Sequence, residues 1–269
     1  MNTDLLTRFD IEANGAPTSR RDALSQTARI GGAAALSMLP FFGMAKKALA
    51  ANPTFTSAAT DFDILNYALT LEYLERSFYR KAIATGRIDS VDAPLFEQIR
   101  KDEDAHVTLL TSAINDAGGT PVSFEDDDFT FTAGGVDYLS SYDLIKALAQ
   151  GFEDTGVRAY KGQAASIENL GYLTVALQIH SVEARHAAAI RRLRGNKGWI
   201  PLDQPDAPAA IAAVYGPGVG TPSEDNVTQA GVDLAAALPG YTRQQISEAF
   251  DEPLDMATVL DIAGPFINS

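Results

Sequence analysis

Apolar residues recur every three to four positions through most of residues 61–194, which is typical of helices with one buried face. A first helix, capped by Asp61 or Asp63, is expected to end near residues 85–86, and the others are expected at residues 93–117, 140–165 and 170–194. The first and third connections are short, whereas residues 120–140 form a long, acidic one. The pattern predicts an all-α fold, a four-helix bundle of two antiparallel hairpins joined by a long crossover.

Residues 196–269 predict a C-terminal extension of loops and short helices. Residues 199–240 are rich in Pro, Gly and Ala, and we expect extended chain laid over the bundle there. Thr242 and Gln245 have the spacing of a capping box, so a short helix should follow to about Phe250, with another at residues 255–262. Two roles are open for this extension: it covers the bundle or it mediates a homodimer.

The N-terminal segment has the features of a twin-arginine export signal. Arg20-Arg21 precedes a weakly apolar stretch at residues 30–44, and Ala48-Leu49-Ala50 offers a small-residue cleavage site. The apolar stretch is shorter than the roughly 20 residues that span a bilayer, so no stable membrane span is expected after cleavage. We expect residues 1–50 to be removed, residues 51–60 to be a linker, and the protein to be periplasmic or otherwise exported. The alternative is an arginine pair in a tail.

Charge and cysteine content narrow the function classes. The formal net charge of −14 argues against nucleic acid as a partner, because phosphate contacts need a surface rich in Lys and Arg. The one short basic run after residue 50, residues 191–194, suits the C-terminus of a helix. The chain has no cysteine, which excludes thiolate catalysis, disulfides and Cys-ligated metals. Glu, Asp and His remain as candidate ligands.

Two Glu-x-x-His motifs interrupt apolar helical faces. Glu103 and His106 lie on the second predicted helix, and Glu183 and His186 lie on the fourth. The apolar residues around the two motifs have the same spacing, on one face of a helix. Because a single such motif is a weak signal, the second copy is what suggests a site.

The first and third predicted helices repeat each other in a similar way. Glu72 is followed seven residues later by Tyr79, and Glu153 is followed seven residues later by Tyr160. Seven residues make two helical turns, so glutamate and tyrosine share a face. The chain therefore consists of two copies of one hairpin, and each copy offers one Glu on its first helix and a Glu-x-x-His on its second.

Four carboxylates that face one another in a core would cost several kcal/mol each and would mostly take up protons. Two divalent cations reverse this balance, since four positive charges match four carboxylates. Side chains three residues apart lie on adjacent turns, so the Glu of each Glu-x-x-His can bridge two metals while its His binds one. An arrangement that is costly without metal is therefore favourable with it.

These motifs resemble those of the ferritin-like superfamily, which includes rubrerythrins, manganese catalases, bacterioferritins and ribonucleotide reductase small subunits. The resemblance covers residues 61–195. The segments LNYALTLEYLERSFY and AFDEPLDMATVL are also similar to exported ferritin-like proteins of the desiccation-related group. The resemblance implies a di-metal centre of two Fe or Mn ions, with six ligands: Glu72, Glu103, His106, Glu153, Glu183 and His186.

Departures from known members bear on the activity. Storage ferritins lack a full second Glu-x-x-His, so the present pair favours redox chemistry on O2 or hydrogen peroxide, as a di-iron or di-manganese oxidase, peroxidase or catalase in stress protection. Two-domain rubrerythrins carry a Cys-ligated iron, and this chain has no cysteine. A peroxidase cycle would need an external reductant, or peroxide would disproportionate as in manganese catalases. The alternatives are a metal-binding or storage protein and a metal-free structural stress protein.

Several nearby residues have two interpretations. Glu75 is three residues after Glu72, but Gly156 takes its place in the second hairpin, which favours a surface position over an extra ligand. His180 is either a hydrogen-bond donor behind the ligands or a partly exposed helix residue. Tyr79 and Tyr160 either hydrogen-bond the ligand carboxylates or fill space.

Other acidic residues are expected to have no role in the site. Asp102 and Asp104 flank Glu103 on other helical faces and should be solvated. Residues 125–128, with the sequence EDDD, lack the spaced oxygen ligands and the glycine turn of a known calcium-binding loop.

Overall fold

The computed structural model describes residues 60–203 and 209–268. The predicted export signal at residues 1–50, and the linker up to residue 59, lie outside the described residues. Within the described part, no helix combines the length and the apolar character needed to cross a membrane.

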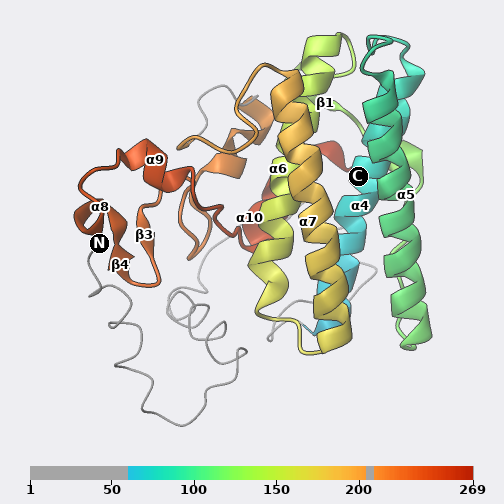
Figure 1. The fold of residues 1–269 in the computed structure, drawn as a ribbon. Helices are drawn as coiled ribbons and strands as arrows, with labels where there is room; N and C mark the ends of the chain where they lie inside the picture. Colours follow the sequence, from blue (N-terminus) through green and yellow to red (C-terminus); the bar gives the residue numbers. More distant parts are fainter. Residues whose placement is uncertain (1–59, 204–208, 269) are drawn as a thin grey trace. The chain divides into compact units, whose positions relative to one another are not determined.

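Four long helices form the bundle: α4 (Asp61–Ala84), α5 (Ala93–Asp116), α6 (Tyr142–Ala164) and α7 (Leu170–Leu193). The helix α4 packs along α5 and α6 packs along α7, while α4 and α6 join the two pairs (Figure 1). The predicted all-α bundle of two hairpins and one crossover is confirmed, and helix ends agree to within a residue or two.

The helix starts depend on side-chain caps. Thr60 caps α4 in a capping box with Asp63, so the prediction that Asp61 or Asp63 is the cap was wrong by one to three residues. The Asp61 carboxylate instead accepts hydrogen bonds from the backbone N–H groups of Glu168 (2.7 Å) and Asn169 (2.8 Å) in the connection between α6 and α7. Ser141 caps α6 by accepting a hydrogen bond from the backbone N–H of Leu144. These contacts tie the two hairpins together at one end of the bundle.

The crossover contains structure that the sequence pattern did not show. Its 3₁₀ helix η1 (Asp126–Asp128) starts with a capping box between Glu125 and Asp128, so the acidic run shapes the chain locally. Strands β1 (Thr132–Ala133) and β2 (Val136–Asp137) pair antiparallel, with Thr132 opposite Asp137 and Ala133 opposite Val136. The turn needs positive φ at both central residues, and Gly134 (59°) and Gly135 (80°) supply it.

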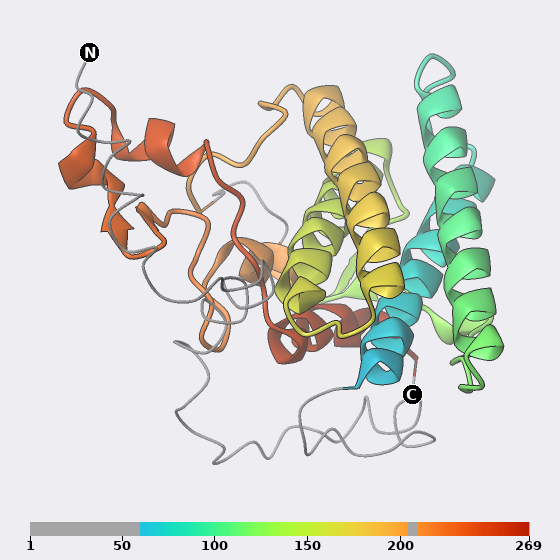
Figure 2. The ribbon, with the colours of Figure 1, turned by 60° about the horizontal axis from the view of Figure 1, so that its bottom comes forward.

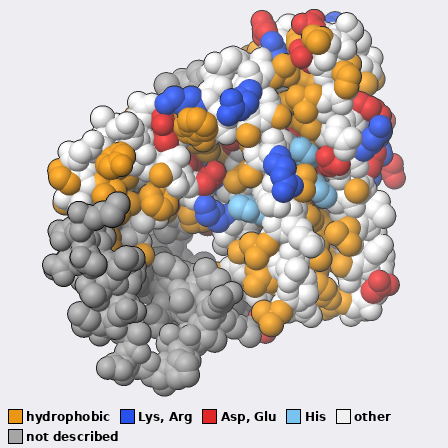
Figure 3. Space-filling model, in the orientation of Figure 1, with side chains coloured by type: hydrophobic (Ala, Val, Ile, Leu, Met, Phe, Trp, Pro, Cys, Tyr) orange, Lys and Arg blue, Asp and Glu red, His pale blue; other side chains and the backbone are white. Residues whose placement is uncertain are grey.

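The bundle face made by α5 and α7 is partly apolar. Leu109 on α5 and Leu170 and Leu177 on α7 are exposed at 44%, 69% and 49%. Hydrophobic side chains, in orange, follow this face, and pale-blue histidine atoms are visible among them (Figure 3). The interior of the bundle therefore comes close to solvent on this side.

The C-terminal extension is more structured than expected. It contains 3₁₀ helices η2 (Ala209–Tyr215) and η3 (Gly264–Phe266), strands β3 (Thr228–Gln229) and β4 (Val232–Asp233), and helices α8 (Leu234–Ala237), α9 (Arg243–Ser247) and α10 (Met256–Ala263). In the antiparallel pair β3–β4, Thr228 is opposite Asp233 and Gln229 is opposite Val232. The expectation of extended chain at residues 199–240 was therefore only partly correct. The predicted capping box at Thr242 and Gln245 is present.

The extension packs on the bundle chiefly through η2 and α10. Both contact α6, and α10 also contacts α4 (Figure 2). The last 3₁₀ helix places Phe266, which is fully buried, against Phe131 of the crossover and Phe152 of α6. The chain end thus completes the same hydrophobic core as the bundle.

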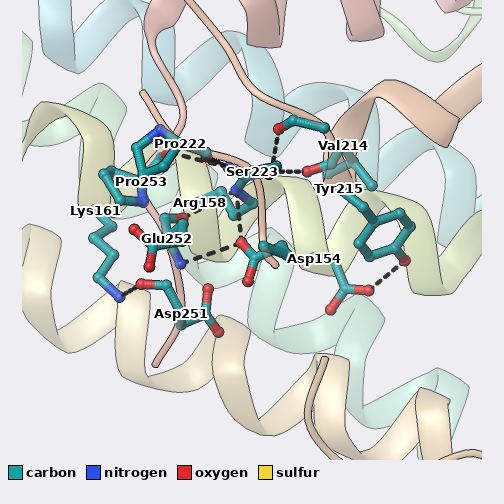
Figure 4. Close-up of polar contacts among 12 residues, drawn as sticks. Asp154, Arg158, Lys161, Val214, Tyr215, Pro222, Ser223, Asp251, Glu252 and Pro253 are labelled. Carbon is teal, nitrogen blue, oxygen red and sulfur yellow. Dashed lines mark hydrogen bonds and ion pairs between the residues drawn. The ribbon is translucent and has the colours of Figure 1, made fainter. Parts of the chain in front are cut away.

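A buried arginine on α6 holds the extension (Figure 4). Arg158 is fully buried and forms an ion pair with Glu224, at 2.9 Å between Nε and Oε1. Its guanidinium also donates hydrogen bonds to five backbone carbonyls of the extension: those of Val214, Gly216, Pro222, Glu252 and Pro253. One turn further along α6, a Cβ on Gly162 would lie 1.9 Å from the carbonyl oxygen of Leu254. The chain therefore approaches α6 more closely than any side chain at position 162 allows.

A second buried ion pair lies on the same side of α6. The Arg191 guanidinium in the last turn of α7 contacts the Asp154 carboxylate at 2.5 and 3.0 Å, and the Tyr215 hydroxyl donates to the same carboxylate (2.6 Å). The basic run at residues 191–194 does end a helix, as predicted, and its first arginine also anchors the extension.

Candidate metal centre

The structure brings the six candidate ligands together in the middle of the bundle. Each long helix contributes: Glu72 from α4, Glu103 and His106 from α5, Glu153 from α6, and Glu183 and His186 from α7. The four carboxylates are fully buried, and the two histidines are exposed at only 8% and 6%. Glu103 and Glu183, one from each Glu-x-x-His, lie close together there.

The six residues form two overlapping groups. Glu72, Glu103, His106 and Glu183 each offer a ligand atom within 4.8 Å of the others, and so do Glu103, Glu153, Glu183 and His186. Glu103 and Glu183 belong to both groups. The geometry is thus compatible with two bridging carboxylates, one from each Glu-x-x-His, and with one terminal carboxylate and one imidazole in each group.

Both imidazoles turn Nδ1 toward the carboxylates. Nδ1 of His106 lies 3.1 Å from Glu72 Oε2 and from Glu103 Oε2, and 3.3 Å from Glu183 Oε1. Nδ1 of His186 lies 3.2 Å from Glu103 Oε1 and 3.3 Å from Glu153 Oε2. The site has the twofold pattern of the sequence repeat.

The two tyrosines hold the terminal carboxylates crosswise. The hydroxyl of Tyr79 on α4 donates to Glu153 on α6, and the hydroxyl of Tyr160 on α6 donates to Glu72 on α4. Of the two interpretations, hydrogen bonding to the ligand carboxylates is therefore the one that the structure shows. The sequence indicated that each tyrosine shares a helical face with a glutamate. It did not indicate that each tyrosine bonds the glutamate of the other helix.

Asp102 was expected to be solvated, and that expectation was wrong. Its Oδ2 lies 3.1 Å from Nε2 of His186, on the side of the ring away from the carboxylates, and its side chain is 32% exposed. The equivalent position in the second hairpin is Val182, so His106 lacks this partner and the two halves of the site differ. Nothing in the sequence marks Asp102, because its partner is on another helix. Asp104 forms ion pairs with Arg80 and Arg100.

Glu75 was expected at the surface, and this too was wrong. It is 4% exposed, and burial together with the nearby Glu183 raises its pKa well above the usual value. The space comes from Gly156, where a Cβ would lie 3.3 Å from Glu75 Oε1 and 3.2 Å from Glu183 Oε2. The surface position was predicted because Gly156 is the equivalent residue in the second hairpin, but the glycine instead leaves room for an inward-facing Glu75. Neither ligand group includes Glu75.

His180 lies beside the site without joining it. It is half-buried, and burial and the charge of Lys161 lower its pKa. Its Nε2 makes no hydrogen bond with the described part of the chain. The structure therefore favours a partly exposed helix residue over a donor to the ligands.

The buried charges oppose one another strongly. Burial raises the pKa of Glu103 to about 7 and that of Glu183 well above its usual value. Burial also acts to raise the pKa of Glu72, but hydrogen bonds from His106 and Tyr160 outweigh it and the pKa is lowered. For His186 burial favours the neutral ring, yet the charge of Glu153 and the hydrogen bond to Glu103 raise its pKa to about 12. Without metal, the site must hold protons to remain neutral.

Several ligand atoms fit a metal better than a hydrogen bond. Glu183 Oε2 is buried and has no hydrogen-bond partner within the described chain. Glu103 Oε1, Glu153 Oε2 and Glu183 Oε1 are also buried, and each lies 3.2 or 3.3 Å from an imidazole Nδ1. Buried polar atoms without partners are uncommon and need a reason. All of these oxygens belong to residues of the two ligand groups. The donors are oxygen and nitrogen alone, which suits Fe and Mn and also accepts Zn.

These pKa shifts predict how metal stabilisation depends on pH. In the metal-free fold, carboxyls with raised pKa keep protons that the unfolded chain releases above about pH 4.5, and both histidines stay charged above about pH 6.5. Stability of the metal-free form therefore falls as pH rises, whereas metal binding requires the deprotonated ligands. We expect the difference in unfolding temperature between loaded and metal-free protein to widen from about pH 5 to about pH 8. Calorimetry of both forms measures this difference in unfolding temperature. A difference that stays constant with pH would contradict the prediction that the metal-free fold binds more protons than the unfolded chain.

Comparison with known proteins gives one match. A family model described as "Ferritin-like domain" matches residues 60–196, a span that contains all four long helices and all six candidate ligands. No curated protein matches the chain.

Proposed function

Because the chain belongs to the ferritin-like domain family, we propose that its mature form is an exported protein whose two iron or manganese ions carry out redox chemistry on O2 or hydrogen peroxide. The superfamily resemblance seen in the sequence is confirmed by this membership. The redox activity, the metal, the export route and the role in stress protection are parts of the proposal.

The observation that carries the proposal is the sharing of Glu103 and Glu183 between two groups of buried candidate ligands. Shared carboxylates would hold two ions side by side, as two-electron chemistry requires and as storage of separate ions does not. A reduced ion pair, when bound, would supply two electrons, enough to turn one hydrogen peroxide and two protons into two water molecules.

The chain's own residues prepare the site for this chemistry. Tyr79 and Tyr160 fix the two terminal carboxylates from the opposite helix, so Glu153 and Glu72 need not reorganise. Asp102 orients the ring of His186. Phe96 and Ile99, both fully buried on α5, help to keep bulk water from that side of the site. With six protein ligands for two ions, coordination positions remain for a small substrate.

The absence of cysteine determines where the electrons for turnover must come from. The chain has no cysteine, so it has no thiolate-bound iron to return electrons. An iron form would stop after one turnover unless an external reductant is present. A manganese form would cycle alone, because two molecules of hydrogen peroxide yield two of water and one of O2 without net electron supply.

The test starts with metal content. Elemental analysis of protein matured in its own cell should give about two Fe or Mn ions per chain. The di-ferrous protein, mixed without oxygen with stoichiometric hydrogen peroxide, should then oxidise quickly, with a rise in near-ultraviolet absorption. His106→Ala should slow this sharply, whereas His180→Ala, which changes a histidine outside both ligand groups, should not.

The opposite results separate the alternatives. A loaded protein that leaves O2 and peroxide untouched in both metal forms would be a metal-binding or storage protein. A metal content near zero would favour a structural, metal-free stress protein. The ion pairs of His106 and His186 with the carboxylates give this last candidate some support, because protonated histidines would offset part of the buried negative charge.

A further inference from the structure

A cavity of about 30 Å³ lies inside the bundle, next to the candidate metal centre. All four long helices line it, with Ala68 and Leu71 from α4, Leu110 from α5, Tyr160 from α6 and Ala176 from α7 among its walls. The walls expose almost only carbon, although Tyr67 and Gln163 are also lining residues. The described chain thus places an apolar space on the bundle axis.

The inner end of the cavity reaches the ligands. Tyr160 is a wall residue, and its hydroxyl donates to the candidate ligand Glu72. Ala68 precedes Glu72 by one helical turn, and Leu110 follows His106 by one turn. Tyr160 therefore connects the wall of the cavity to the candidate centre.

The outer end comes close to solvent on the apolar face of α5 and α7. Ala113, Tyr172 and Val175 line the cavity and are half-buried, whereas Ala176, deeper inside, is 6% exposed. A small apolar molecule would therefore need to pass only side chains that are already partly exposed.

Size and polarity select the occupant. A site for one water needs about 10–15 Å³, so this cavity has room for a molecule of two or three heavy atoms. Hydrogen peroxide would lose its hydrogen bonds to water on entering the cavity, and the apolar walls would not replace them. This loss costs a few kcal/mol. O2 is uncharged, apolar and small, and it loses little on leaving water.

We propose that this cavity binds O2 and is its route to the centre, so that O2 is the oxidant that the fold selects. The inference rests on the proposed redox function of the six ligands. In the step it serves, O2 takes two electrons from the ion pair and two protons, and becomes hydrogen peroxide. Peroxide itself would have to approach by another path.

Xenon tests the cavity without any turnover. Crystals of the metal-loaded protein under xenon pressure should show one xenon atom between Tyr160 and Ala176. Ala176→Leu fills the cavity, and Ala113→Leu narrows its outer end at a half-buried position that tolerates a larger side chain. Both variants should lose the xenon and retain their metal. Ala84→Leu, at an exposed position outside the cavity, is the matched control and should keep both.

Rapid mixing then tests the route. The rate of oxidation by O2 should fall roughly ten-fold in both cavity variants, while the rate with hydrogen peroxide should stay unchanged. No xenon in the wild type, or an unchanged O2 rate in variants that have lost xenon, would overturn the inference. Equal slowing with O2 and peroxide would also overturn it, since selectivity would be absent. If xenon binds but the loaded wild type reacts with neither oxidant, the proposed function fails and the apolar binding site stands.

Discussion

Replacing Glu103 by Gln should reduce the metal content from about two ions per chain to nearly none. Glu103 belongs to both ligand groups, so the change removes one charged oxygen donor from each. The amide has almost the same size, and burial, which raises the pKa of Glu103 to about 7, already disfavours its charge in the metal-free fold. The variant should therefore fold and lose metal, as elemental analysis after gel filtration would show.

Glu75→Gln is the matched control. Glu75 is as deeply buried, lies beside Glu183 through the space left by Gly156, and has a raised pKa for the same reason. It belongs to neither ligand group, so about two ions per chain should remain. Equal metal loss from both variants would show that the centre uses five carboxylates and that the assignment of ligands from the internal repeat is wrong.

The candidate ligands were predictable because they repeat. Each hairpin carries one Glu and one Glu-x-x-His at helical spacing, so four faces point to one place once the helices pair. Residues that lack a counterpart in the repeat were missed. Asp102 pairs with a histidine 84 positions away, and Val182 occupies the equivalent position. Contacts of this kind depend on how two helices face each other, which spacing within one helix does not show.

The long helices were also predictable, since periodic apolar faces, capping residues and glycines agreed on their limits. The small elements were not. Strands β1 to β4 have two residues each, too short for an alternating pattern to appear. The extension was read from its Pro, Gly and Ala content, but its position depends on Arg158 on α6, whose partners are mostly backbone carbonyls. Every residue has a backbone carbonyl, so the sequence does not show which carbonyls will accept these hydrogen bonds.

The two clusters of buried charge on α6 have different roles. Glu153, Gly156 and Tyr160 face the candidate metal centre, whereas Asp154, Arg158 and Lys161, on another face of the same helix, bind the extension. The first cluster has ligand atoms without hydrogen bonds. Arg158, at the centre of the second, contacts five carbonyls and one carboxylate, and none of its nitrogens is without a partner within the described chain. One cluster therefore suits a ligand and the other suits stability.

Arg158→Met should destabilise the protein by about 3–5 kcal/mol, the usual cost of breaking a buried ion pair from one side. The change leaves Glu224 buried without its cation and deprives five carbonyls of a donor. The pKa of Glu224, which burial and Asp251 already raise to about 8, should rise further, so the carboxyl would hold its proton more firmly and part of the loss would be recovered. Chemical denaturation and limited proteolysis within residues 209–255 would measure the effect.

Two further variants decide whether the loss comes from docking of the extension. Lys197→Met removes the half-exposed ion pair with Glu248 in the same extension and should cost no more than about 1 kcal/mol. Gly162→Ala should destabilise although alanine favours a helix interior by about 1 kcal/mol, because its Cβ would meet the Leu254 carbonyl at 1.9 Å. In both Arg158→Met and Gly162→Ala, limited proteolysis should cleave the extension faster. The bundle should keep its metal, since all six candidate ligands lie on α4 to α7. Slow cleavage in Arg158→Met, or a stabilised Gly162→Ala, would mean that the extension does not depend on this contact with α6.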